Sequence, residues 1–310
     1  MTTKVSVRLV AQLSAVFLMA CGTAAAPGLS DGSKVQHEAI VDGTLAPDSV
    51  QNVGLVAYQL NGVWSMYGCS GTLISPRVFV TAAHCLADLT DSVQFGVSFA
   101  ASVPSVQSPD FFTPVPANVK VYKGKGIVHP DFTWNDNFDE ASTDPDVAVI
   151  VLDEAPRGIK PAGLVRTGYF NRQHGLIGHT YGMAGYGLAS LAAVNQTAPY
   201  DAGTREYSTI KLGAIYPGMV VFDRIAGKGS PCLGDSGGPG FPLGERKTSH
   251  MPKNVELVTS LVRGFTTPDI QANRFCEGGG IFTRLDTPQA QSFLRGIIGQ
   301  DHDDNLDDDR

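Results

Sequence analysis

Short apolar runs separated by turn-forming residues make up most of the chain. They extend from residue 40 to about residue 300, with glycine, proline, asparagine and aspartate between them. Spacing of this kind is typical of strands in a β-barrel or β-sandwich. The clearest predicted strands are residues 53–60, 78–83, 147–152, 209–215, 257–262 and 281–285.

One helix is predicted after the last of these strands. Thr287 and Pro288 are typical of a helix start, because proline is tolerated in the first turn. An apolar stripe at helical spacing follows. Its members are Phe293, Leu294, Ile297 and Ile298. Residues 301–310 carry six aspartates and one arginine, so we expect a solvated, disordered acidic tail there.

Residues 1–21 have the pattern of an export signal. A basic start precedes an apolar stretch over residues 9–20, which is too short to span a membrane permanently. The stretch ends in Leu-Met-Ala-Cys, which resembles the bacterial lipobox, and the resemblance implies that Cys21 becomes the lipidated first residue. The alternative is an ordinary secretory signal, with Cys21 discarded or left in a pro-segment. Residues 22–39 lack hydrophobic periodicity and are interpreted as a linker or pro-segment.

Composition agrees with a folded, turn-rich protein and disfavours some functions. Hydrophobic residues make up 43% of the 310 residues, enough for a sizeable core, which excludes a mainly disordered chain. Glycine accounts for 35 of 310 residues, about 11%, against roughly 7% in an average protein. The formal net charge of −7 argues against a nucleic-acid partner. The length alone suggests about two domains.

The cysteine count carries information about the compartment. Five cysteines are an odd number, but lipidation of Cys21 would leave four, which can pair. Export places the chain outside the cytoplasm, where disulfides persist.

Three polar residues at the ends of apolar runs are candidates for nucleophilic catalysis. Ser236 lies in Gly-Asp-Ser-Gly-Gly-Pro, where glycines let the backbone bend sharply and a substrate carbonyl approach closely. A serine hydroxyl is a weak nucleophile until a base takes its proton. His84, in Thr-Ala-Ala-His-Cys, and Asp146, in Asp-Val-Ala-Val-Ile, are candidates for that base and its carboxylate partner. Singly, each could be structural: a glycine-rich turn, a core histidine and a strand-end cap.

These segments, in the order His, Asp, Ser, resemble the chymotrypsin-like serine proteases. Further matches are Ile-Val-Asp-Gly at 40–43, Cys-Ser-Gly-Thr-Leu-Ile at 69–74, Ala-Gly-Tyr-Gly at 184–187 and Gly-Ile-Phe-Thr-Arg-Leu at 280–285. The resemblance covers residues 40–300. It implies an all-β fold of two packed antiparallel β-barrels, with the active site in the cleft between them and a C-terminal helix.

The resemblance also implies a role for each candidate residue. Ser236 attacks the scissile carbonyl to form an acyl-enzyme, and His84 takes its proton and passes it to the leaving amine. Asp146 fixes the histidine tautomer and stabilises the imidazolium. The backbone N–H groups of Gly234 and Ser236 form the oxyanion hole. The substrates are polypeptides, and neither a cofactor nor a metal is implied.

Disulfide pairing follows from the same resemblance. It implies that Cys69 pairs with Cys85 beside the histidine, and that Cys232 pairs with Cys276 across the specificity pocket. Closing a loop of about 15 residues stabilises a fold by roughly 3 kcal/mol in the entropic model.

The specificity pocket is predicted to be uncharged and narrow. The family position at its base is Ser230, and trypsin-like members that cleave after lysine or arginine have aspartate there. Val262 and Gly280 are the predicted walls, Ser260 is also assigned to the pocket, and a valine where glycine is common narrows it. We therefore expect a preference for small or medium apolar side chains, and the open wall at Gly280 keeps an aromatic preference as the alternative.

Activation is expected to require one cleavage. In this family a cut frees the ammonium of a new N-terminus, which pairs with the aspartate before the nucleophile; here these are Ile40 and Asp235. The residue before the cut is Ala39, which matches the predicted small-residue preference and suggests self-cleavage, with a separate activating protease as the alternative. The cut would also release the enzyme from a lipid on Cys21. The second hypothesis is a binding role: the chain would be a non-catalytic homologue, or a precursor that is never activated and binds partners at the cell surface.

Overall fold

The computed structural model describes residues 40–89, 93–103, 113–134, 140–172, 175–195, 200–243, 254–255, 257–259 and 276–308. Contacts divide the chain into two units, residues 1–36 and residues 37–310, and every described residue lies in the second. Cys21, Ser260 and Val262 lie outside the described residues. No helix among the described residues is long and apolar enough to cross a membrane.

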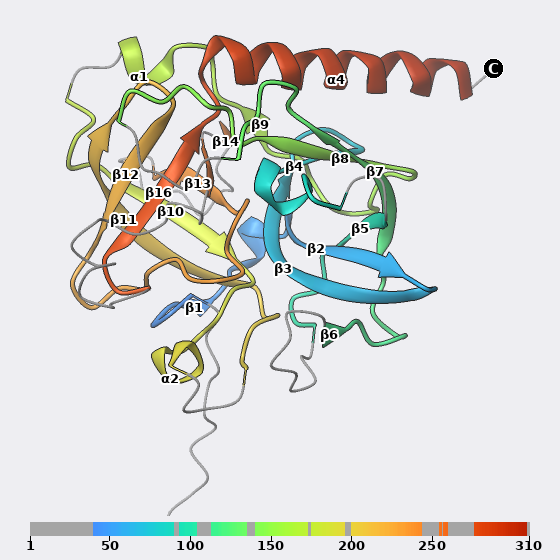
Figure 1. Cartoon of the computed structure of the whole chain (residues 1–310), viewed down its shortest axis with the longest axis horizontal. Coiled ribbons are helices and arrows are strands. Elements are labelled where there is room, and N and C mark those ends of the chain that lie inside the picture. Colours follow the sequence, from blue (N-terminus) through green and yellow to red (C-terminus); the bar gives the residue numbers. More distant parts are fainter. Residues whose placement is uncertain are drawn as a thin grey trace, which may run out of the picture. The chain divides into compact units, whose positions relative to one another are not determined.

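Six antiparallel strands close the first barrel, drawn in blue to green in Figure 1. Their spatial order is β2-β5-β7-β8-β4-β3, and β3 pairs back onto β2 to complete the ring. A short strand, β6 (Thr113–Pro114), adds to the edge of β3. The strands of the ring are β2 (Val53–Leu60), β3 (Val63–Leu73), β4 (Val78–Thr81), β5 (Gln94–Ser98), β7 (Tyr122–Val128) and β8 (Ala148–Leu152).

A second antiparallel sheet, drawn in yellow to red in Figure 1, has the order β11-β10-β13-β15-β16-β12. Pairing of β11 with β12 joins its two ends, and β1 (Thr44–Leu45) adds to the edge of β11. The expected all-β fold is therefore confirmed. The strands of this sheet are β10 (Thr180–Gly185), β11 (Glu206–Ile215), β12 (Met219–Arg224), β13 (Pro239–Pro242), β15 (Leu257–Thr259) and β16 (Gly279–Arg284).

The remaining elements are short connections. Strands β9 (Gly163–Leu164) and β14 (Asn254–Val255) form a parallel pair. Single turns of helix are η1 (Asp48–Val50), η2 (Ala83–Cys85), α1 (Tyr169–Arg172) and α2 (Leu191–Val194). Of these, η2 positions a candidate catalytic residue.

Strand β2 explains how one apolar run serves two cores. Successive side chains of a strand point to opposite faces. Val56 and Tyr58 belong to the core of the first barrel, whereas Leu55 and Ala57 pack in a separate cluster with residues of the second sheet such as Phe241. Both faces are buried, so the run shows no polar alternation, and the two sheets are joined across an apolar layer.

The C-terminal helix α4 (Pro288–Asp308) begins at the predicted proline and packs on the first barrel (Figure 1). Leu294 of its apolar stripe is fully buried in that core. The prediction that a disordered tail begins at residue 301 is wrong, because the helix continues to Asp308. Asp301 is 2% exposed and accepts hydrogen bonds from Ser75 Oγ (2.9 Å) and Arg77 Nε (2.7 Å). A basic partner on the barrel therefore holds the first acidic residue in place.

Candidate active site

His84 and Asp146 meet because the strands beside them are paired. His84 lies in η2, directly after β4, and Asp146 lies just before β8. The β4–β8 register sets Thr81 opposite Ala148, which brings the two strand ends together. Asp146 Oδ1 accepts the backbone N–H of His84 at 2.9 Å, and Oδ2 lies 2.8 Å from His84 Nδ1.

The two side chains are shielded from water without being sealed. Their exposed fractions are 9% for His84 and 12% for Asp146. The indole of Trp134 lies edge-on to the imidazole, with 6.3 Å between ring centroids. With Nδ1 held by the carboxylate, Nε2 is the ring nitrogen left to exchange a proton with another group. A nucleophile would have to lie on that side of the ring.

Ser236 is tied to the first barrel by main-chain contacts. Its carbonyl oxygen accepts the N–H of Ser70, in β3, at 2.7 Å. Ser70 Oγ donates to the carbonyl of Gly234 at 2.9 Å and accepts the N–H of Tyr186 at 2.9 Å. The sulfur of Cys85, the residue after His84, lies 3.9 Å from the Ser236 carbonyl oxygen. The structure therefore brings the Ser236 loop against the turn that carries His84.

Two glycines are required by the shape of this loop. Gly234 and Gly237 have φ angles of +101° and +79°, which L-residues with a side chain rarely adopt. A Cβ atom on Gly237 would lie 2.1 Å from Thr81 Oγ1. Within the described residues, the N–H groups of Gly234 and Ser236 make no hydrogen bond. Both donors are thus available to a ligand.

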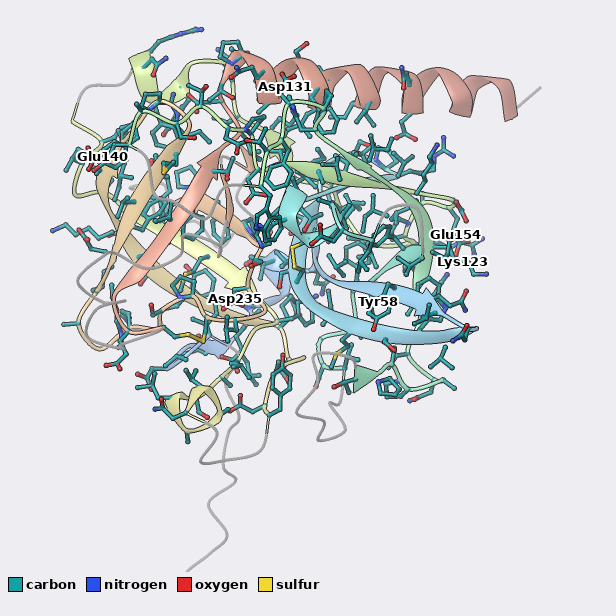
Figure 2. All side chains as sticks on the ribbon, in the orientation of Figure 1. Tyr58, Lys123, Asp131, Glu140, Glu154 and Asp235 are labelled. Carbon is teal, nitrogen blue, oxygen red and sulfur yellow. A yellow bond between two sulfur atoms is a disulfide. The ribbon has the colours of Figure 1, made fainter. Side chains whose placement is uncertain are left out.

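Asp235 is a buried carboxylate with main-chain partners. It is 3% exposed, and its oxygens accept the N–H groups of Gly187 (2.9 Å) and Cys232 (2.8 Å). Burial raises its pKa to about 7, although the two N–H donors act in the opposite direction. Figure 2 labels this residue. Within the described residues, Asp235 has no cationic partner in the uncut chain.

Ile40, the predicted partner of Asp235, contacts a different carboxylate. Its side chain is 1% exposed, in the core of the second sheet, and its backbone nitrogen donates to Glu206 Oε2 at 3.1 Å. Val41 forms a bridge with Ser230. Sequence reasoning missed Glu206, whose single acidic side chain at the start of an apolar strand is the only signal available.

Two of the residues predicted to form the specificity pocket, Ser230 and Gly280, lie in uncharged, closely packed surroundings. Ser230 is fully buried, and its hydroxyl accepts the N–H of Gly279 at 3.2 Å. A Cβ on Gly280 would lie 2.7 Å from Pro231 Cγ, so that position is restricted to glycine by contact. The predicted pocket residues Ser260 and Val262 lie outside the described residues.

Comparison with known proteins identifies the family. The family model described as Trypsin matches residues 46–255, about two thirds of the chain. The chain belongs to the trypsin family. It is similar to Trypsin from Simulium vittatum, with 26% identity over 220 residues that cover 65% of this chain and 79% of that protein. It is also similar to Brachyurin from Leptuca pugilator, with 30% identity over 179 residues, or 56% of this chain and 70% of that protein.

Two further matches agree with this assignment. Serine protease Hayan from Drosophila melanogaster is 26% identical over 237 residues; these are 70% of this chain but 34% of that longer protein. The solved structure titled HL collagenase superposes with a TM-score of 0.56 at 20% identity, covering 84% of this chain and 99% of that one. The latter supports the fold alone. As a member of the trypsin family, the chain is a serine endopeptidase that acts on polypeptides.

Both disulfides expected from the family resemblance are confirmed. Cys69 pairs with Cys85 and Cys232 pairs with Cys276. The first joins β3 to the His84 turn, and the second joins the Ser236 loop to the segment before β16. His84 lies near the sulfurs of Cys69 and Cys85, but these sulfurs are bonded to each other and offer no thiolate to a metal. The two bonds indicate an oxidising compartment outside the cytoplasm.

Proposed function

We propose that this trypsin-family endopeptidase uses Ser236 as its nucleophile, His84 as general base and Asp146 as the carboxylate that orients the base. The observation that carries the proposal is the pair of hydrogen bonds between His84 and Asp146, next to the Ser236 loop. Asp146 keeps the proton of the imidazole on Nδ1 and stabilises the imidazolium that forms when Nε2 takes the proton of Ser236. An acyl-enzyme follows, and water releases it by the same route.

The oxyanion of the tetrahedral intermediate would bind the N–H groups of Gly234 and Ser236. Both are backbone donors on one tight loop, and neither has an internal acceptor among the described residues. Preorganised donors of this kind stabilise charge that develops only in the transition state, and losing one typically costs on the order of 10²–10³ in rate.

The substrate pocket would accept small or medium apolar side chains. Ser230 gives its base no charge to pair with lysine or arginine. The packing of Gly280 against Pro231 supports a restricted volume on the described side. Val262 would narrow the pocket from its other wall. A wall left open at Gly280 would instead give an aromatic preference, which is the alternative.

Cleavage between Ala39 and Ile40 would activate the enzyme through Asp235. In the uncut chain this buried carboxylate has no cationic partner among the described residues. A buried charge without a partner is costly, so a new ammonium nearby would be drawn to it. Asp235 adjoins both oxyanion donors in sequence, so fixing its position would fix theirs.

The precursor would be exported and anchored through a lipid on Cys21, and the enzyme would mature by self-cleavage at Ala39 or through a similar protease. Two formed disulfides support export. Ala39 is the kind of residue that the proposed pocket accepts. An ordinary secretory signal and a separate activating protease are the alternatives to anchoring and self-cleavage.

A substrate panel on matured enzyme tests the proposed chemistry. A serine-directed phosphonate should label Ser236, and the Ser236→Ala variant should take up none. Among peptides that differ only at the residue before the scissile bond, Ala, Val or Leu should give the highest kcat/KM. A pocket of this kind separates substrates one methylene apart by about 1–3 kcal/mol. Fast cleavage after Arg would refute the pocket assignment, and no labelling with Ile40 free would favour a binding role.

A further inference from the structure

Two buried carboxylates lie side by side near the proposed activation site. Gly185 in β10 and Glu206 in β11 are directly opposite each other in the antiparallel register. Side chains of such a pair point to the same face of the sheet, with Cβ atoms about 5 Å apart. The space where a Gly185 side chain would stand is filled by Asp235, whose Oδ1 is 2.1 Å from that Cβ position. Asp235 therefore occupies the place next to the stem of Glu206.

The segment that would become the N-terminus already wraps Glu206 in the uncut chain. The Ile40 nitrogen donates to Glu206 Oε2 at 3.1 Å. A Cβ on Gly43 would lie 2.8 Å from that same oxygen, so the turn passes close over the carboxylate. The turn is itself closed by a hydrogen bond from the Gly43 N–H to the Ile40 carbonyl. Ile40 and Glu206 are both at most 1% exposed, so the contact is dry.

Cleavage would change the charge of this contact without moving the nitrogen. An amide offers one N–H donor and no charge, whereas an α-ammonium offers three donors and a full positive charge. The first donor already has Glu206 as its acceptor. The remaining donors would reach the neighbouring carboxylate, Asp235, which has no cation among the described residues.

We propose that Glu206 is a second receptor for the Ile40 α-ammonium, so that two buried carboxylates, Glu206 and Asp235, hold the cleaved N-terminus together. The proposal rests on the activation step proposed above and adds a residue to it. Glu206 acts as a positioning residue: it holds Ile40 in place before the cut and shares the ammonium afterwards. Its ligand is a primary ammonium at the start of an Ile-Val segment.

Other charged groups near this site have different partners. Arg205 directs Nη1 at the carbonyls of Val53 and Phe99, at 3.2 Å each. Asp42 pairs with Arg224 at the surface. Tyr200 has its pKa raised to about 12, chiefly by burial and also by the charges of Asp201 and Asp235, so it is neutral over the pH range of the test.

The test compares the pH profiles of matured variants. Residues 36–39 of the full chain are replaced by the recognition sequence of an added processing protease, so that every variant begins at Ile40 after one cut. Two adjacent carboxylates should keep the α-ammonium protonated to higher pH than one. In Glu206→Gln, the alkaline loss of kcat/KM should therefore move down by about one pH unit. At a pH above both midpoints, the ratio of kcat/KM to its value at pH 7 should then be roughly tenfold lower than in the parent.

Matched variants separate the possible results. Gln keeps an acceptor for the Ile40 N–H, so the uncut Glu206→Gln chain should retain the melting temperature of the parent. If Gln impairs folding, Glu206→Asp serves in its place: it keeps the carboxylate, so its kcat/KM at alkaline pH should stay close to that of the parent. Glu154→Gln removes an exposed carboxylate at the far edge of the first barrel (Figure 2) and should leave the profile unchanged. An unmoved limb in Glu206→Gln overturns the proposal. Full activity in Asp235→Asn would instead refute the role of Asp235 in activation.

Discussion

The Asp146 carboxylate makes two separate contacts with one residue, and they predict a specific loss in Asp146→Asn. The amide keeps the shape and one acceptor but presents N–H groups as well, so it no longer requires the proton on His84 Nδ1. With the proton on Nε2, the lone pair of the imidazole lies on Nδ1, and Nε2 cannot accept the proton of the serine hydroxyl. We expect kcat to fall by about 10⁴ with KM little changed, since the loss arises in the chemical step.

Steady-state kinetics with active-site titration checks this expectation. Phosphonate labelling of the variant should slow in parallel with kcat, because the same proton transfer activates Ser236. A variant with near-normal kcat would show that Asp146 only caps the His84 turn.

The buried carboxyl group of Asp235 should make the stability of the uncut chain depend on pH. Its folded pKa, raised by burial to about 7, lies above the ordinary value near 4 in an unfolded chain. The stabilisation is therefore fully present below about pH 4 and is lost as the pH rises through 7. The loss amounts to at most about 4 kcal/mol, three pKa units at about 1.4 kcal/mol each.

Replacing Asp235 by Asn removes this titration. On a Ser236→Ala background that prevents self-digestion, urea unfolding is measured at pH 4.5 and pH 8 for both chains. The parent should lose more free energy of unfolding between the two pH values than Asp235→Asn, whose amide stays neutral. Equal losses would mean that another group already neutralises Asp235 before cleavage.

At the scale of elements, apolar runs predicted strands well where both faces are buried. The run 53–60 coincides with β2, whose two faces belong to two cores. Strand β11 begins at Glu206, three residues before the predicted run, because backbone pairing with β10 extends past the apolar positions. Periodicity reports burial of apolar side chains, and it has no means of detecting a buried acid that is balanced by a contact far away in the sequence.

Helix α4 also contains a buried acid that sequence patterning did not detect. Charge patterning assigned residue 301 to a solvated tail, yet Asp301 is buried against Ser75 and Arg77. Asp301→Ala removes the acceptor of two hydrogen bonds and leaves the guanidinium, with 17% exposure, without this carboxylate. Removing such a partner costs about 1–3 kcal/mol, which lowers the melting temperature by a few degrees in a domain of this size.

Calorimetry of Asp301→Ala and of Asp153→Asn, an exposed acid on the same barrel, checks the assignment. The control should melt within about a degree of the parent, since surface substitutions are close to neutral. Activity should be unchanged in both variants at room temperature. An equal melting temperature for Asp301→Ala would mean that the contacts of Asp301 with Ser75 and Arg77 contribute nothing to stability.

At the scale of the whole molecule, motif order in the sequence predicted the fold, the two disulfide pairs and the contact between His84 and Asp146. The motifs of His84 and Asp146 sufficed because they lie at the ends of two paired strands, where the register sets Thr81 opposite Ala148. The partner of Ile40 was not predictable in this way, because Glu206 is 166 residues distant and belongs to none of the matched motifs. A contact of that kind follows only from packing.

The positions of the two disulfides determine what a cut at Ala39 would release. Both disulfides join residues after position 40, so after a cut at Ala39 no covalent bond would hold the catalytic part to residues 1–39.

If Cys21 is lipidated, the uncut chain should sediment with membranes and the cut chain should be released. In cells that express Ser236→Ala alone, self-cleavage predicts that all of the chain stays uncut and membrane-bound, whereas the active parent appears in the soluble fraction with Ile40 first. Cys21→Ser should be soluble whether cut or not. Ser236→Ala with an Ile40 N-terminus would refute self-cleavage, and active enzyme retained on the membrane would refute release.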